Sequence, residues 1–156
     1  MGTKYTSTIT VASIDDLDIV SMALIPHLTA PFIIGLNGAM GSGKTTFVRQ
    51  FSAVLGSNDW VNSPTYAIIQ RYQAPPLNLL HIDLYRTTSD YEIDQLAIPS
   101  LVQDNTIVLM EWADKASDII QDITLDFTIM NESTRQITVS SNNHDWVGQL
   151  NNTNTH

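Results

Sequence analysis

One short segment constrains the fold of this chain more than any other, because it fixes a strand, a turn and a helix in order. Residues 38–45 read Gly-Ala-Met-Gly-Ser-Gly-Lys-Thr and match the phosphate-loop pattern G-x-x-x-x-G-K-[ST] in full. At average residue usage such a match arises by chance about once in 30,000 positions. The apolar run 32–36 before it is typical of a buried parallel strand, and residues 44–55 after it predict an amphipathic helix. The segment therefore predicts an α/β fold that holds phosphate groups.

The residue types in this loop suit the binding of a nucleotide. Glycines allow backbone torsions that turn main-chain N–H groups towards phosphate oxygens. The N-terminus of the following helix adds partial positive charge. We expect Lys44 to reach the β- and γ-phosphates and the hydroxyl of Thr45 to ligate Mg²⁺.

A magnesium ion at this loop also needs a carboxylate, and two apolar runs end in one. Residues 79–82 are followed by Asp83, and residues 107–110 are followed by Glu111. Ligands of an open parallel sheet bind outside the carboxyl ends of its strands, so both acids are expected on the loop side. The sequence leaves open which of them dominates metal binding. His81 would share a sheet face with Asp83, and we interpret it as a structural residue rather than a base.

Three further features each allow more than one interpretation. Arg86, after Tyr85, could hold phosphate or a partner's carboxylate, or form a plain surface ion pair. Trp112 suits a partner contact or a lid over the site, and equally the core. Residues 62–66 lie where many phosphate-loop proteins carry a nucleotide-sensing switch, but they could also be an ordinary loop.

Hydrophobic periodicity and turn residues predict the other elements. We expect strands over 8–11, 66–72, 77–84 and 106–110, helices over 14–27 and 90–96, and a terminal hairpin of strands 123–130 and 135–140. The fold class is α/β, P-loop NTPase-like: a mostly parallel sheet flanked by helices, with an antiparallel C-terminal extension. Residues 1–150 are expected to form one P-loop domain, and residues 151–156 a disordered tail.

The charge balance narrows the function classes. Seven Lys and Arg residues face sixteen Asp and Glu residues, which gives a net charge of −9. The cations are scattered, whereas proteins that bind nucleic acid tightly through phosphates show a basic stripe, so direct tight binding is disfavoured. No cysteine is present, which excludes disulfides and thiolate chemistry. No apolar run is long enough to cross a membrane and the N-terminus is polar, so we expect a cytoplasmic protein.

Four pieces of the sequence together resemble the TsaE (formerly YjeE) family of small bacterial ATPases. They occur in the family's order and approximate spacing, from about Thr8 to Ser140. The pieces are Gly38–Thr46, Ser63-Pro64-Thr65-Tyr66, His81-Ile82-Asp83-Leu84-Tyr85-Arg86 and Glu111-Trp112. The element H-x-D-x-Y-R after S-P-T-[FY] is specific to this family among phosphate-loop proteins.

The resemblance implies an ATP- and Mg²⁺-binding protein that hydrolyses ATP slowly alone. It would act with TsaD and TsaB in making threonylcarbamoyladenosine on tRNA, which it would meet only through that complex, and its hydrolysis cycle would reset the complex between turnovers. By position in the motifs, Thr45 and Glu111 would ligate Mg²⁺, and Asp83 would orient the attacking water or the magnesium shell.

The remaining roles are carried over in the same way. Ser63 and Thr65 would be switch-like, and Tyr85, Arg86 and Trp112 would serve the switch or the partner surface. Ile14 and Arg135 would lie near the adenine. The nucleotide contacts are then Ile14, Gly38, Met40, Gly41, Ser42, Gly43, Lys44, Thr45, Thr46 and Arg135.

The chain departs from the family pattern in two places. The family commonly carries an acid after the first glycine of the loop, where this chain has Ala39, and we expect an effect on resting hydrolysis or on the response to partners. A Leu-Gly pair and a following Glu are also common after H-x-D-x-Y-R, whereas residues 96–100 here read Leu-Ala-Ile-Pro-Ser. No contacts are therefore carried over between Asp90 and Gln103.

Two other functions fit a phosphate loop in a chain of this size. A small-molecule kinase needs several arginines around the migrating phosphoryl group, and this chain has only four in total, without a paired motif. A nucleotide-dependent binding module with negligible turnover differs from the leading hypothesis only in degree. Phosphate release, measured alone and with TsaD and TsaB, separates these alternatives.

Overall fold

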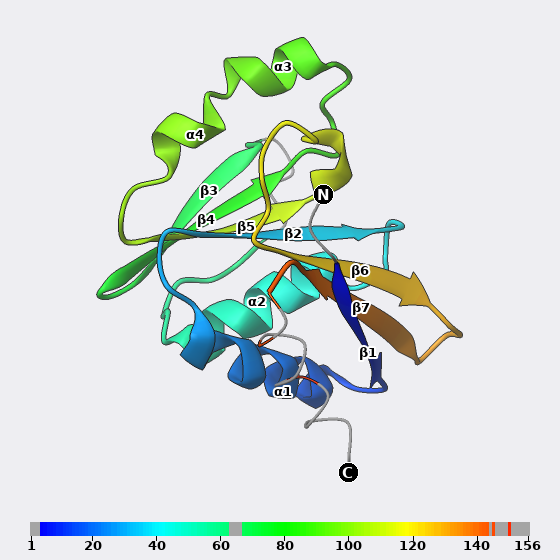
Figure 1. Cartoon of the computed structure of the whole chain (residues 1–156). Helices are drawn as coiled ribbons and strands as arrows, with labels where there is room; N and C mark the ends of the chain where they lie inside the picture. The colour runs from blue at the N-terminus through cyan, green and yellow to red at the C-terminus, as the bar shows by residue number, and fades with distance from the viewer. Residues whose placement is uncertain (1–3, 63–66, 144, 146–149, 151–156) are drawn as a thin grey trace.

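The computed structural model describes residues 4–62, 67–143, 145 and 150, and a seven-stranded sheet forms its centre (Figure 1). The strands lie in the order β1-β7-β6-β2-β5-β4-β3. Their bounds are β1 Tyr5–Val11, β2 Phe32–Gly38, β3 Ile69–Ala74, β4 Leu77–Asp83, β5 Thr106–Glu111, β6 Ile123–Ile129 and β7 Arg135–Ser141. The helices are α1 Ile14–Leu24, α2 Lys44–Leu55, α3 Asp90–Gln95 and α4 Ile98–Leu101, with short 3₁₀ turns η1 Ile25–His27 and η2 Ala113–Lys115.

Parallel pairing is confined to the centre of the sheet. β2 pairs in parallel with β5 and β6, and β4 pairs in parallel with β5. β3 pairs with β4, β7 with β6, and β1 with β7, each in the antiparallel sense. The α/β fold and the antiparallel C-terminal hairpin are confirmed. Antiparallel pairing goes further than the sequence predicted, however, because it also includes β1 and β3 at the two edges.

Helices cover both faces of this sheet. α1 and α2 pack on one face, while α3 and α4 lie on the other (Figure 1). Alternate residues of the central strands divide between two buried clusters: Leu79 and Leu109 face α1 and α2, whereas Leu80 and Val108 face α3 and α4. By this alternation His81, Asp83 and Glu111 lie on the same face as α2.

Local signals explain where the two long helices begin and end. The carboxylate of Asp16 accepts hydrogen bonds from the backbone N–H groups of Ala12 and Ser13, which caps the start of α1. Gly56 ends α2 with a φ of 105°, which glycine adopts without strain. The helix predicted over residues 14–27 is α-helical only to Leu24 and then tightens into η1, with Pro26 in its first turn.

Other elements begin or end a few residues away from their predicted bounds. β1 begins at Tyr5 rather than Thr8, and β3 runs from Ile69 to Ala74 rather than from 66 to 72. The short helix α4 was not predicted. None of the helices in the described part of the chain has both the length and the apolar character needed to cross a bilayer.

Candidate nucleotide-binding site

The phosphate loop joins the end of β2 to the start of α2, as the sequence predicted. Gly38, Gly41 and Gly43 have φ values of 147°, 80° and 109°, which side chains rarely adopt. Gly38 also has no room for a side chain, because a Cβ there would lie 2.7 Å from both the carbonyl oxygen of Phe127 and the hydroxyl of Ser42. The loop conformation thus depends on its glycines.

Lys44, the first residue of α2, is only 5% exposed, and its ammonium group turns back into the loop. It donates to the carbonyl oxygens of Gly38 and Ala39. The same Nζ lies 4.4 Å from the ring centroid of Trp112, within the range of a cation–π contact. Burial lowers the pKa of Lys44, and the carboxylates of Glu111, Asp83 and Asp114 oppose that shift.

A buried chain of contacts joins α2, β5 and β4. The hydroxyl of Thr45 donates to Glu111 Oε1 at 2.9 Å. The other oxygen of the same carboxylate, Oε2, lies 2.6 Å from Nε2 of His81. Glu111 is 2% exposed and His81 is 0% exposed. Both oxygens of the carboxylate are therefore held, one by the loop helix and one by the neighbouring strand.

Asp83 lies beside Glu111, since the two residues are partners in the parallel register of β4 and β5. Its carboxylate accepts a hydrogen bond from the backbone N–H of Tyr85 at 3.0 Å. Burial raises the pKa of Asp83, and the Glu111 carboxylate adds to the rise, while the Tyr85 N–H, His81 and Lys44 oppose it. Asp83 is therefore the acid at this edge that takes up a proton more readily than usual.

Two aromatic rings flank the loop from the strand ends. Tyr85, 47% exposed, and Trp112 have ring centroids 5.2 Å apart. Trp112 has a φ of 57°, and its backbone N–H donates to the carbonyl oxygen of Leu36. A non-glycine residue in this region is strained, and such strain concentrates at functional sites. The half-buried side chain of Trp112 lines the cavity beside Lys44 and also packs against the hydrophobic cluster beneath α3 and α4, so it combines two of the positions that the sequence suggested.

Two cavities lie on either side of the loop and share Gly41, Gly43 and Thr46 in their walls. The smaller cavity, of about 250 Å³, is lined by the residues that we expect to bind phosphate and metal, and we call it the phosphate cavity. It is lined by Met40, Gly41, Gly43, Lys44, Thr45, Thr46, Asp83, Tyr85, Glu111 and Trp112. Residues predicted from the loop and from two separate strand ends thus meet in one cavity.

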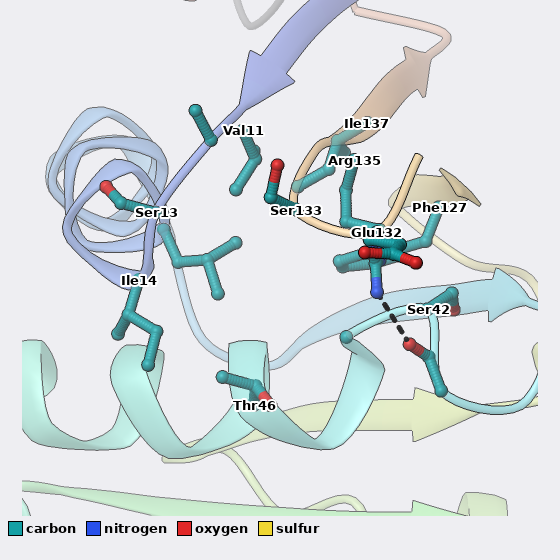
Figure 2. Close-up of a pocket in the computed structure, with 14 residues that line it drawn as sticks. Val11, Ser13, Ile14, Ser42, Thr46, Phe127, Glu132, Ser133, Arg135 and Ile137 are labelled. Atoms are coloured by element: carbon teal, nitrogen blue, oxygen red, sulfur yellow. Dashed lines mark hydrogen bonds between the residues drawn. The ribbon is translucent and has the colours of Figure 1, made fainter. Parts of the chain in front are cut away.

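The larger cavity, of about 320 Å³, lies between the start of α1, the loop and the hairpin of β6 and β7 (Figure 2). Ile14 and Arg135, assigned near the adenine, both line it. Arg135 reaches across to the carbonyl oxygen of Gly41, at 3.4 Å, and also donates to that of Asn131. The other residues that line this cavity are Val11, Ala12, Ser13, Leu17, Gly41, Ser42, Gly43, Thr46, Phe127, Glu132, Ser133 and Ile137.

The remaining predicted site residues fall into two groups. Ser63 and Thr65 lie outside the described residues, and Arg86 and Gly38 line neither cavity. Arg86 is exposed and lines neither cavity, although it follows Tyr85 directly. Gly38 lies beneath the loop, where it contacts Ser42 and Phe127, and not in a cavity wall.

Two residues with a clear part in the site were missed by sequence reasoning. Asn37 donates to Asp126 and accepts from the backbone N–H of Asp114, which ties the loop after β5 to β2. Its signal was available, since a polar residue directly before Gly38 interrupts an apolar strand. Lys115 donates to three carbonyl oxygens of the loop after β4, and its acceptors 28 to 31 residues away leave no local signal.

The chain is similar to proteins of one family. The family model described as threonylcarbamoyl adenosine biosynthesis protein TsaE matches residues 11–137. The chain is 32% identical over 94 residues to the tRNA threonylcarbamoyladenosine biosynthesis protein TsaE of Haemophilus influenzae, covering 60% of each chain. It is 38% identical over 94 residues to the protein of the same name from Bacillus subtilis, covering 57% of this chain and 58% of the relative.

The matched region thus spans less than two thirds of the length of these curated relatives. Among solved structures, YdiB of Bacillus subtilis superimposes with a TM-score of 0.74 over 98% of this chain and 97% of the other. Sequence identity in that superposition is 18%, so this likeness concerns the fold alone.

Proposed function

The chain belongs to the TsaE family, whose members take part in the biosynthesis of threonylcarbamoyladenosine on tRNA, and from this premise we propose its biochemical role. It is a Mg²⁺-dependent ATPase, slow on its own, that acts with TsaD and TsaB. Its hydrolysis cycle resets that complex between rounds of tRNA modification. The observation that carries this proposal is the meeting of Lys44, Thr45, Glu111 and Asp83 in one cavity.

The donor set at the loop fits a magnesium ion. Mg²⁺ is near-octahedral with bonds of about 2.0–2.1 Å, so neighbouring ligand oxygens lie about 2.9 Å apart. The hydroxyl oxygen of Thr45 and Oε1 of Glu111 are 2.9 Å apart. These two residues would hold the ion, which neutralises charge on the phosphate oxygens when bound.

The loop itself would hold the triphosphate. Its backbone N–H groups and the N-terminus of α2 favour anions. Lys44 is already buried beside the loop, and an anionic phosphate next to its ammonium group would counter the desolvation that lowers its pKa. We propose that the ammonium group of Lys44 contacts the β- and γ-phosphates and offsets their negative charge.

Asp83 would orient the attacking water. It lies in the phosphate cavity, beside Glu111 but without a contact to Thr45 among the described hydrogen bonds. Its raised pKa suits a group that takes part in moving a proton, whereas Glu111, fixed by Thr45 and His81, suits metal binding. The family resemblance implies the same division between the two acids, which the residue pattern alone left open.

The larger cavity would take the adenine and ribose. Leu17, Phe127 and Ile137 supply apolar walls, and Arg135 supplies hydrogen-bond donors at the rim. A cavity with apolar walls and a few polar groups is typical of a cofactor site. The two cavities share Gly41, Gly43 and Thr46 in their walls, and a nucleotide would cross the loop between them.

The test measures phosphate release from ATP by this chain alone and with TsaD and TsaB, together with threonylcarbamoyladenosine formed on tRNA. We expect slow release alone, stimulation by the pair, and several rounds of modification only when this chain is present. Lys44→Ala and Thr45→Ala should abolish the stimulation. Transfer of phosphate to a metabolite without any partner would instead support a kinase and contradict the proposal.

A further inference from the structure

His81 is a buried polar residue whose contacts differ from those of a histidine used only for packing. It lies in β4 with no exposed surface, and its Nε2 is 2.6 Å from Oε2 of Glu111. Its second ring nitrogen, Nδ1, is buried and has no hydrogen-bond partner within the described part of the chain. Buried polar groups ordinarily have hydrogen-bond partners. Because Nδ1 has none among the described residues, the hydrogen bond with Glu111 is the main polar interaction of this ring.

The partner of that hydrogen bond is the acid that would bind magnesium. Glu111 has two oxygens, and each is held by a different element: Oε1 by Thr45 of α2, and Oε2 by His81 of β4. With Oε2 fixed, rotation of the carboxylate is restricted and Oε1 stays directed at Thr45. Groups that orient a metal ligand in this way raise the affinity of a site for its metal.

We propose that His81 is a positioning residue for the metal site, which holds Glu111 so that its Oε1 and the Thr45 hydroxyl are set to bind Mg²⁺ together. This inference rests on the proposed function, because it concerns the same nucleotide site. It replaces the interpretation of His81 as a residue of structural importance alone.

A packing role makes a different prediction. The ring of His81 lies 6.0 Å from that of Tyr72, between β3 and β4, so a variant that fills the same space would preserve packing. Only a variant that presents an N–H at the position of Nε2 would preserve the contact with Glu111. Glutamine can do so, because its amide nitrogen reaches about as far as Nε2, whereas the amide of asparagine stops near the position of Nδ1.

The experiment uses the full chain with His81→Gln, His81→Asn and His81→Leu. Calorimetric titration with ADP is repeated over a series of Mg²⁺ concentrations, including none, and the melting temperature of each variant is recorded. We expect His81→Leu and His81→Asn to need roughly 10- to 100-fold more Mg²⁺ for the same tightening of ADP binding. His81→Gln should stay close to the wild type, and binding of ADP without Mg²⁺ should be alike in all four proteins.

The outcomes separate this inference from the function on which it rests. Equal Mg²⁺ requirements in all four proteins would overturn the role of His81, as would a loss of ADP binding that is the same with and without Mg²⁺. If His81→Leu does not fold, the comparison of Gln with Asn decides. Failure of the wild-type chain to bind ADP or ATP at all would contradict the proposed function itself.

Discussion

Within the described part of the chain, two residues other than glycine have left-handed backbone, and they differ in what that conformation achieves. Ala97 has a φ of 51° and Trp112 a φ of 57°. This region costs an L-residue about 1–2 kcal/mol. At Trp112 the strain coincides with a ring placed over Lys44 in the phosphate cavity. Ala97 lines neither of the two cavities at the loop, and the family resemblance would place a glycine at its position.

Ala97→Gly is therefore expected to stabilise the protein. Glycine adopts a positive φ freely, and part of the gain is offset by its larger entropy in the unfolded chain, which leaves about 0.5–1 kcal/mol. Chemical denaturation measures the change. Ala53→Gly, at an exposed position inside α2, serves as the control and should destabilise by roughly 1 kcal/mol. Equal destabilisation by both substitutions would contradict the prediction.

Asp83, which we propose orients the attacking water, is a residue at which the requirements of activity and of stability differ. Its pKa in the folded protein is raised above the ordinary value of 3.8, so folding favours the protonated acid. The stabilisation from that proton is fully present below the unfolded pKa and is lost as pH rises through the folded pKa. At neutral pH the ionised, partly buried carboxylate thus lowers stability.

We expect Asp83→Asn to melt at a higher temperature than the wild type at neutral pH, with the difference narrowing as pH falls towards 3.8. Hydrolysis in the complete complex should fall by roughly 100-fold or more. Scanning calorimetry at several pH values and phosphate release provide the two measurements. The exposed Asp104→Asn should alter neither quantity. Wild-type hydrolysis by Asp83→Asn would refute the role given to Asp83.

At the scale of elements, the site depends on two loops that follow β4 and β5 and are joined by Lys115. The ammonium group of Lys115, at the end of η2, donates to the carbonyl oxygens of Leu84, Tyr85 and Thr87. It thereby links the loop that follows Asp83 to the loop that begins with Trp112. Three charge-assisted hydrogen bonds from one side chain explain how an irregular segment is held against the site.

Lys115→Met should release this link while keeping most of the apolar stem. We expect a loss of about 1–3 kcal/mol in stability, because hydrogen bonds to a charged group are lost. Amide hydrogen exchange should become faster over residues 84–87, and stimulation by TsaD and TsaB should weaken. Lys4→Met, at an exposed site, is the matched control. Unchanged exchange over 84–87 would show that Lys115 does not hold the loop.

At the scale of the whole molecule, the main electrostatic feature is the net charge of −9. Of the seven cations, at least four donate to backbone carbonyl oxygens, namely Lys44, Arg49, Lys115 and Arg135. Apart from the buried Glu111, the acids are exposed or partly exposed, and acids outnumber cations sixteen to seven in the chain. For a chain proposed to work on tRNA modification, this balance favours contact with proteins that bind the RNA rather than with the RNA itself.

We therefore expect the acidic chain to bind a basic surface of TsaD and TsaB and to compete with tRNA for that surface. Raising salt from about 0.1 M to 1 M shortens the Debye length from about 10 Å to about 3 Å. Association should slow by roughly tenfold or more over that range, measured by surface plasmon resonance. Added tRNA should weaken the interaction. Simultaneous binding of tRNA and this chain, without mutual weakening, would contradict the idea.

Features that local sequence patterns encode could be predicted from the amino-acid sequence alone. The phosphate loop with its flanking strand and helix was predicted at the correct residues, because strand, glycine turn and helix start are contiguous in the chain. Asp83 and Glu111 were also placed correctly at one edge, because ends of parallel strands meet there. Ile14 and Arg135, which were assigned near the adenine only through the family resemblance, line one cavity together.

Contacts between residues far apart in the chain could be identified only in the folded protein. His81 and Glu111 are 30 residues apart and Arg135 and Gly41 are 94 apart, so no local pattern links them. The roles proposed for Asp83 and Glu111 rest on contacts of this kind, since Thr45 and His81 form hydrogen bonds with Glu111, whereas Asp83 accepts one from the backbone N–H of Tyr85. The physical reason is that burial and hydrogen-bond partners set the role of a carboxylate, and both arise only when separate strands and helices pack together.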